Sequence, residues 1–206
     1  MVPGLKFMPS FLDTDRQRAL ARSLAAAAAD APFFTPVMPR SGRPFSVRMT
    51  NLGSLGWVSD RAGYRYQATH PETGKPWPEI PGAVLEVWRS ASGYAGDPEA
   101  CLVNLYRQDA RMGLHQDRDE EDLAAPVVSI SLGDTAVFRI GGTTRGGRTE
   151  SLRLASGDVL VMGGASRLCF HGVDRVLAGT STLIEGGGRI NLTLRRVRRA
   201  GLATEN

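Results

Sequence analysis

The stretch RINLTLR, residues 189–195, alternates polar and apolar side chains at every position. Because neighbouring side chains of an extended strand point to opposite faces, its three aliphatic residues share one face. The other face carries four polar side chains: Arg189, Asn191, Thr193 and Arg195. The run CLVNLY divides in the same way, with Asn104 and Tyr106 on one face. A single strand of this kind favours a polar face turned to solvent.

The chain beyond residue 100 has the composition of a β-protein. Short apolar runs are separated there by Gly or Asp turns: CLVNLY, VVSISL, TAVFRI, ESLRL, DVLVM, RLCFH and RINLTLR. Seven or more such strands within about a hundred residues predict a sandwich or a jelly roll.

The N-terminal part predicts helices around a loop-rich segment. Residues 14–30 are rich in alanine, the best helix former, and Thr14 and Gln17 match a capping box at the start. An apolar stripe follows at Leu20, Leu24 and Ala27. Residues 31–82 are rich in Pro, Gly and aromatics, which indicates short strands joined by long loops that often carry binding. A second helix is expected after Pro81, with three side chains packed inward: Val84, Leu85 and Trp88.

Bulk composition limits the class of protein. With 206 residues, 42% of them hydrophobic and 22% charged, the chain suits one soluble domain with its own core. A net charge of +4 and a pI near 9.5 permit an anionic partner such as a nucleic acid without demonstrating one. Two cysteines are too few for a disulfide framework, and no apolar run approaches the roughly eighteen residues of a membrane span. The start also lacks the pattern of a signal peptide, so we expect a cytoplasmic protein.

A histidine stands beside five acidic residues in GLHQDRDEEDL, residues 113–123, which is either a solvated turn or part of a metal site. In an extended backbone His115 and Asp117 project to one side. As a third ligand, His70 is disfavoured because it lies in a Pro-rich loop where a solvated histidine is expected. His171 ends the apolar run RLCFH, which a jelly roll can bring opposite. Two histidines and one carboxylate suit a non-haem Fe(II) oxygenase, with a catalytic zinc site as the main rival.

Two arginines favour iron over zinc. Fe(II) oxygenases of this type use 2-oxoglutarate, whose far carboxylate requires an anchor, and a guanidinium holds a carboxylate bidentately. Arg189 and Arg195 share one face of the strand after His171 and are placed to supply that anchor. Hydrolytic zinc enzymes have no need of such a pair.

With these residues the sequence closely resembles the AlkB family, and within it the bacterial AlkB branch. The family consists of Fe(II)/2-oxoglutarate-dependent dioxygenases that demethylate alkylated nucleic-acid bases. The resemblance rests on NLY at 104–106, HQDRDE at 115–120, His171 and RINLTLR, with further matches in NLGSLGW, GYRYQ and GKPWPEIP. It implies a mainly β fold with flanking helices, a double-stranded β-helix (jelly roll) with an N-terminal nucleotide-recognition lid. The single domain then covers 1–206, with helices and lid at 1–95, the catalytic core at 96–199 and a tail at 200–206.

The resemblance also assigns site residues. The metal ligands fall on His115, Asp117 and His171. The 2-oxoglutarate contacts fall on Asn104, Tyr106, Arg189, Asn191 and Arg195. The substrate residues are Trp57 and Tyr64 in the lid, with Asp119 and Arg145 near the base and backbone. No side chain beyond the metal ligands is expected to act as a separate acid or base.

The implied reaction uses Fe(II), 2-oxoglutarate and O₂ to oxidise an N-methyl group, and it releases formaldehyde, succinate and CO₂. The expected substrates are 1-methyladenine and 3-methylcytosine in single- or double-stranded DNA, with RNA as a further candidate, and the enzyme is expected to act as a monomer away from membranes. One alternative is a 2-oxoglutarate oxygenase that acts on a protein or a small molecule and has no need of a nucleotide lid. The other is a nucleic-acid binder or zinc hydrolase, which has no need of the two arginines.

Three of the four substrate residues also have a plainer interpretation. Trp57 would be a buried core aromatic, Asp119 a surface charge and Arg145, in GGTTRGGR, part of a solvated turn. In the functional interpretation Trp57 stacks on a flipped base opposite the ring of His115, and Asp119 accepts a hydrogen bond from the exocyclic amine of the base. Arg145 then contacts phosphate.

Overall fold

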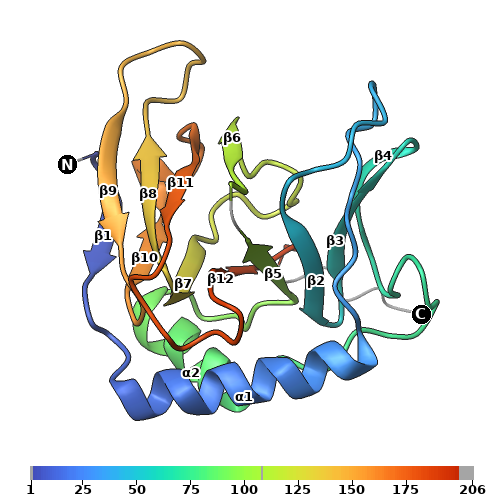
Figure 1. Cartoon of the computed structure of the whole chain (residues 1–206). Coiled ribbons are helices and arrows are strands. Elements are labelled where there is room, and N and C mark those ends of the chain that lie inside the picture. The colour runs from blue at the N-terminus through green and yellow to red at the C-terminus, as the bar shows by residue number, and fades with distance from the viewer. Residues whose placement is uncertain (1, 108, 200–206) are drawn as a thin grey trace.

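Two antiparallel sheets pack face to face, with two helices outside the larger one, in the computed structural model, which describes residues 2–107 and 109–199 (Figure 1). The larger sheet has the order β1-β10-β7-β12-β5-β2: β1 (Leu5–Met8), β10 (Val159–Met162), β7 (Val127–Gly133), β12 (Arg189–Arg195), β5 (Ala100–Tyr106) and β2 (Arg48–Gly53). The smaller sheet has the order β6-β11-β8-β9: β6 (Met112–His115), β11 (His171–Leu177), β8 (Thr135–Ile140) and β9 (Glu150–Leu154). The remaining elements are the hairpin β3 (Gly56–Asp60) and β4 (Gly63–Gln67), helices α1 (Thr14–Asp30) and α2 (Gly82–Ala91), and the 3₁₀ turn η1 (Gly164–Ser166). The expected mainly β jelly roll with flanking helices is confirmed.

The alternation along β12 places its polar side chains inside the molecule. Its aliphatic residues join one hydrophobic cluster with side chains of both helices, among them Leu24 of α1 and Trp88 of α2. A second cluster fills the space between the sheets and joins Tyr106 and Met162 of the larger sheet to Phe138 of the smaller one. The whole of β12 is buried, so the polar face lines the interior and the expectation of a face turned to solvent is wrong. The faces assigned to CLVNLY are confirmed, since Val103 and Tyr106 fall in different clusters.

The run RLCFH is not a strand, and His171 begins β11 instead of ending a strand. The 3₁₀ turn η1 precedes it, closed by hydrogen bonds between Ser166 and Gly163. Arg167 then turns its guanidinium into the protein, where it donates to the backbone carbonyls of Asp117 and Ala125. The turn and the coil after it therefore take the place of the expected strand, and β11 starts only at His171.

Helix α1 has the predicted bounds but a different cap. Asp13, not Thr14, caps it, with Oδ1 accepting from the Arg16 amide at 2.8 Å. Gln17 does not close a capping box; its side chain donates to the Leu12 carbonyl and accepts from Ser156. The predicted stripe is confirmed at two positions, since Leu20 and Leu24 are buried.

The second helix also packs by one face, although not quite the expected one. In α2 the buried residues are Val84, Val87, Trp88 and Ala91, whereas Leu85 is only half-buried. Strand β1 was not predicted, because four residues carry too little alternation, and it pairs with β10 at the sheet edge. Within the described ranges no helix is both long and apolar enough to cross a bilayer. The cytoplasmic location, the monomeric state and the division at residue 95 stay predictions.

His70 is buried at 1% exposure, so the expectation of a solvated histidine is wrong. Its Nε2 lies 2.8 Å from the Pro32 carbonyl, and its Nδ1 accepts from the amides of Glu72 and Thr73. The ring also packs against the aromatic ring of Trp77, with centroids 5.1 Å apart. Both ring nitrogens are therefore used to hold the 70–76 loop against the chain that enters β2.

We expect His70→Ala to lower the free energy of unfolding by about 2–3 kcal/mol, because the Pro32 carbonyl loses its donor, the amides of Glu72 and Thr73 lose their acceptor, and a cavity remains. Urea unfolding measures this loss, and the kcat of the folded fraction should stay at the wild-type value. Lys75→Ala, at an exposed position of the same loop, should change stability by less than about 0.5 kcal/mol. Equal stability of both variants would contradict the structural role of His70.

Candidate functional site

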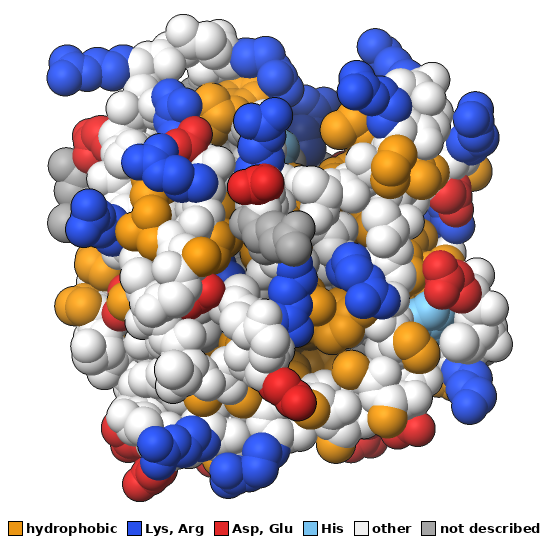
Figure 2. All heavy atoms as spheres, viewed as in Figure 1, with side chains coloured by type: hydrophobic (Ala, Val, Ile, Leu, Met, Phe, Trp, Pro, Cys, Tyr) orange, Lys and Arg blue, Asp and Glu red, His pale blue; other side chains and the backbone are white. Residues whose placement is uncertain are grey.

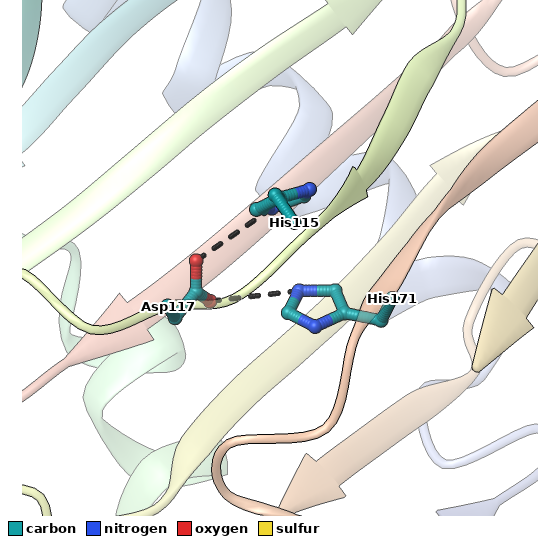
Figure 3. A group of neighbouring side chains, drawn as sticks. All are labelled: His115, Asp117 and His171. Atoms are coloured by element: carbon teal, nitrogen blue, oxygen red, sulfur yellow. Dashed lines mark ion pairs between the residues drawn. The ribbon is translucent and has the colours of Figure 1, made fainter. Parts of the chain in front are cut away.

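Three side chains converge between the sheets (Figure 3). His115 ends β6, Asp117 follows in the coil, and His171 begins β11, directly opposite His115 in the strand pairing. One possible ligand atom from each side chain lies within 4.8 Å of the others. The two Asp117 oxygens each lie 3.7 Å from one histidine Nε2. The predicted ligands are thus brought together, although Asp117 is held by a coil and not by an extended strand.

Hydrogen bonds at Nδ1 hold both imidazole rings in place. Nδ1 of His115 lies 2.9 Å from the Gly113 carbonyl, and Nδ1 of His171 lies 3.0 Å from the Cys169 carbonyl. A ring that donates from Nδ1 presents Nε2 as the lone-pair donor to a metal. Burial lowers the pKa of His171 to about 4, which keeps this ring neutral and able to act as a ligand.

The three residues fit an Fe(II) ion. Asp117 Oδ2 is buried without a hydrogen-bond partner in the described part of the chain, which is costly unless a cation binds there. Burial alone would raise the pKa of Asp117, but Arg195 and then the two histidines bring it below its usual range, so this carboxylate is ionised. Two neutral imidazole nitrogens and one carboxylate are the donor set of the facial Fe(II) site.

These ligands lie in a cavity of about 640 Å³ whose walls come from both sheets and from the β3–β4 hairpin. The register of β5 with β12 sets Tyr106 opposite Arg189 and Asn104 opposite Asn191, so four of the five predicted co-substrate residues form one polar patch. Burial raises the pKa of Tyr106 to about 12, so its phenol keeps the proton and can donate. Asn104 Oδ1 has no hydrogen-bond partner among the described residues.

Arg189 is a buried cation that forms no ion pair with a carboxylate of the described residues. Its Nη atoms donate to Ser131 Oγ at 2.8 Å and to the Leu154 carbonyl at 3.2 Å, and its Nε has no partner among the described residues. Burial lowers the pKa of Arg189 to about 10, which still leaves it charged at neutral pH. An unpaired buried guanidinium is costly, so this surrounding fits an anionic ligand such as the far carboxylate of 2-oxoglutarate.

Arg195 has different surroundings, because its charge is already paired. Nη2 donates to Asp117 Oδ1 at 2.8 Å, and Nε lies 3.4 Å from Glu120 Oε1. Burial alone would lower the pKa of Arg195, but Asp117 first and the neighbouring Tyr66 and Glu120 keep it well above its usual value. The two arginines, predicted to serve one carboxylate together, therefore lie at two ends of the cavity, with Arg195 at the metal end.

The predicted substrate residues lie at the mouth of this cavity. Trp57 stacks on Tyr64 with ring centroids 5.5 Å apart, and its Nε1 donates to Asp119 Oδ2 at 2.9 Å. Trp57 is half-buried and not a core aromatic, and Asp119 is placed at the mouth by the coil that follows β6, since no strand persists there. Arg145, in the β8–β9 loop, lies over the ring of Phe170 at 5.0 Å.

Basic side chains gather around the same end of the molecule. Figure 2 shows many Lys and Arg side chains along the upper edge, which carries the β8–β9 and β3–β4 loops in Figure 1. Arg118 and Arg145 line the cavity mouth, and both are exposed. A cationic rim of this kind attracts phosphate by charge and carries no base specificity.

Two residues of the site were not predicted. Glu120 and Arg167 are almost fully buried, at 1% and 4% side-chain exposure, and are joined by an ion pair of 3.0 Å. Glu120 was hidden among the acidic residues of HQDRDE. Arg167 carried a usable signal, because a lone arginine before an apolar run is expensive to bury unless it is paired.

Comparisons with known proteins agree with this site. The family model described as the 2OG-Fe(II) oxygenase superfamily matches residues 4–195. An alpha-ketoglutarate-dependent dioxygenase AlkB homolog of Caulobacter vibrioides is 59% identical over 97% of this chain and 90% of its own. The dioxygenase AlkB of Escherichia coli is 44% identical over 86% of this chain and 83% of its own. The solved structure of OsALKBH1 has a TM-score of 0.80 at 32% identity and covers 95% of this chain and 98% of its own.

We expect His115→Ala, Asp117→Ala and His171→Ala each to weaken metal binding by more than the roughly 10–100-fold that loss of an outer hydrogen-bond partner costs. Titration with Co(II), followed by its absorption bands, measures the affinity without any turnover. His70→Ala serves as the control and should bind Co(II) as the wild type does. Undiminished binding by any of the three variants would remove that residue from the metal site.

Proposed function

The chain belongs to the AlkB family within the 2OG-Fe(II) oxygenase superfamily, and on that premise we propose that it oxidatively demethylates alkylated bases of nucleic acids. The proposed substrates are 1-methyladenine and 3-methylcytosine in DNA, with RNA as a further candidate. The observation that carries the proposal is the position of Trp57, Tyr64 and Asp119 at the mouth of the cavity whose interior holds the three metal ligands.

The roles of the cavity residues follow from their surroundings. His115, Asp117 and His171 hold Fe(II), and Arg189, Asn104 and Tyr106 receive the far carboxylate of 2-oxoglutarate. Asn191 and Arg195 lie toward the metal end of the same polar face. When bound, Fe(II) and 2-oxoglutarate supply the oxidation of the methyl C–H bond by O₂, after which the methyl carbon leaves as formaldehyde. The protein itself supplies binding, orientation and a site closed to bulk water.

The mouth suits a flat, positively charged base. Methylation at N1 of adenine or N3 of cytosine gives a cationic ring that no longer pairs, so extrusion from the stack costs less. The indole of Trp57 offers a stacking surface and a favourable face for a cation. Asp119 uses one oxygen to hold Trp57, and no described residue donates to its other oxygen, which is therefore available to accept from the exocyclic amine.

The experiment that tests this function is turnover of an oligonucleotide panel. Single- and double-stranded DNA and RNA carrying each methylated base are incubated with Fe(II), 2-oxoglutarate and O₂, and the products are read by mass spectrometry. Formaldehyde and succinate should form in equal amounts with the cationic lesions. If no oligonucleotide is demethylated while a peptide or small molecule is oxidised, the alternative of a protein or small-molecule oxygenase replaces the proposal.

Replacement of Arg189 should impair binding of 2-oxoglutarate. We expect Arg189→Lys to raise the apparent KM for 2-oxoglutarate by about 10–100-fold, since a charge-assisted hydrogen bond contributes roughly 1.5–3 kcal/mol and the bidentate fork is lost. Initial rates of succinate formation at varied 2-oxoglutarate measure the change. Arg153→Lys, an exposed arginine of β9, is the matched control and should leave this KM unchanged. An unaltered KM in Arg189→Lys would contradict the assignment.

Asp119 should distinguish cationic from neutral methylated bases. Asp119→Asn keeps the size of the side chain and removes its charge, so we expect kcat/KM to fall about fivefold more for 1-methyladenine and 3-methylcytosine than for the neutral 1-methylguanine and 3-methylthymine. Trp57→Ala should weaken all four. The measurement is a competition assay at fixed salt, because phosphate contacts depend on salt. Glu121→Gln, an exposed acidic neighbour, is the control, and equal losses for all four lesions in Asp119→Asn would refute charge recognition.

A further inference from the structure

Glu120 is a buried carboxylate that contacts side chains from β4, from β12 and from the turn before β11. Its Oε1 accepts a short hydrogen bond from the Tyr66 hydroxyl and lies 3.4 Å from Arg195 Nε. Its Oε2 accepts from Arg167 Nη2 at 3.0 Å. None of these groups is a metal ligand, and the reaction proposed above does not use Glu120 or Tyr66.

The Tyr66 contact leads to the substrate hairpin. Tyr66 lies on β4 directly opposite Trp57 of β3, and Tyr64 lies two residues earlier on the same strand. The hairpin contributes Trp57 and Tyr64 to the cavity mouth but is a separate two-stranded sheet, joined to neither of the larger sheets by a strand ladder. Its position therefore depends on contacts of both strands. Hydrogen bonds with Asn51 and Val37 hold β3, and on β4 Tyr66 contacts Glu120 and Arg195.

The two arginine contacts lead to the metal end of the cavity. Arg195 shares Glu120 with Tyr66 and also binds Asp117 at 2.8 Å. Arg167 donates to the Asp117 carbonyl at 2.6 Å, so it holds the backbone of that residue. In a buried network the charges are not screened by water, so displacement of one member alters the energy of the others.

We propose that Glu120 is a positioning residue that couples the β3–β4 hairpin to the metal end of the cavity, where one end of 2-oxoglutarate binds, through Tyr66 and Arg195. Binding of 2-oxoglutarate beside Arg195 then steadies the hairpin, and by thermodynamic reciprocity a base held by the hairpin tightens the co-substrate. The inference rests on the proposed function in one respect, the assignment of Arg195 to the binding of 2-oxoglutarate.

The test measures the hairpin itself, without nucleic acid or turnover. Amide hydrogen exchange of residues 56–67 is followed by mass spectrometry in the Mn(II)-loaded protein, with and without 2-oxoglutarate and in the absence of oxygen. In the wild type, 2-oxoglutarate should slow exchange of the hairpin about five- to tenfold, within the usual range of coupling between two sites. In Tyr66→Phe, which removes only the hydroxyl, the slowing should vanish.

Tyr94→Phe is the matched control. Tyr94 also donates a short hydrogen bond to a carboxylate of the same segment, Asp122, but no described contact joins Asp122 to Arg195. This variant should keep the wild-type slowing. Glu120→Gln should lose it, and its thermal melt separates loss of coupling from loss of fold.

Two results would overturn the proposal: no slowing in the wild type with 2-oxoglutarate bound, or equal slowing in Tyr66→Phe. Calorimetric titration of 2-oxoglutarate into the Mn(II) protein shows that the ligand is bound in each variant. Failure of the base-demethylation proposal appears separately, as absent turnover of the oligonucleotide panel, and leaves the exchange result readable. Full turnover of the panel with no effect of Tyr66→Phe on exchange would retain the function and reject the coupling.

Discussion

A buried cluster of four charges sets the geometry of the whole site. Asp117 and Glu120 come from the coil after β6, Arg195 from the end of β12 and Arg167 from the turn before β11. Two carboxylates and two guanidiniums cancel one another in a region with little water, so each must stay within hydrogen-bonding distance of its partner. Loss of one charge would leave an uncompensated ion inside the protein. The cluster therefore fixes the coil that carries Asp117, although no strand holds it.

Arg189 completes this charge pattern from the other end of the cavity. The four-charge cluster is already neutral, and the described carboxylates leave Arg189 without an ion-pair partner. A divalent cation at the triad would add positive charge to a cavity that already contains this guanidinium. A dicarboxylate co-substrate offsets that excess when one end lies near the cation and the other at Arg189. Binding of the cation therefore favours binding of the co-substrate, and the reverse, because each offsets the charge of the other.

The sequence was enough to predict the fold class and the three side chains that meet between the sheets, because alternation and short motifs carry that information. It could not show which side of a strand faces the interior, since the polar face of β12 is covered by the smaller sheet, which only folding brings opposite it. For the same reason the sequence did not reveal the buried contacts of Glu120. An acidic residue beside other acidic residues looks solvated until the fold brings two arginines to it. His70 was misplaced for a related reason, because only the folded loop supplies partners for both ring nitrogens.

Strand β12 has both of its edges occupied, by β5 on one side and β7 on the other. A shift of one residue would carry Ile190 into the cavity and turn Arg189 toward the helices, so no insertion or deletion within the strand can be absorbed locally. Over evolutionary time this strand can change only by substitution in place. Insertions and deletions can occur in the loops at the mouth of the cavity, where they disturb the packing of the core little. Diversification of such an enzyme should then alter which base it accepts far more readily than which co-substrate it consumes.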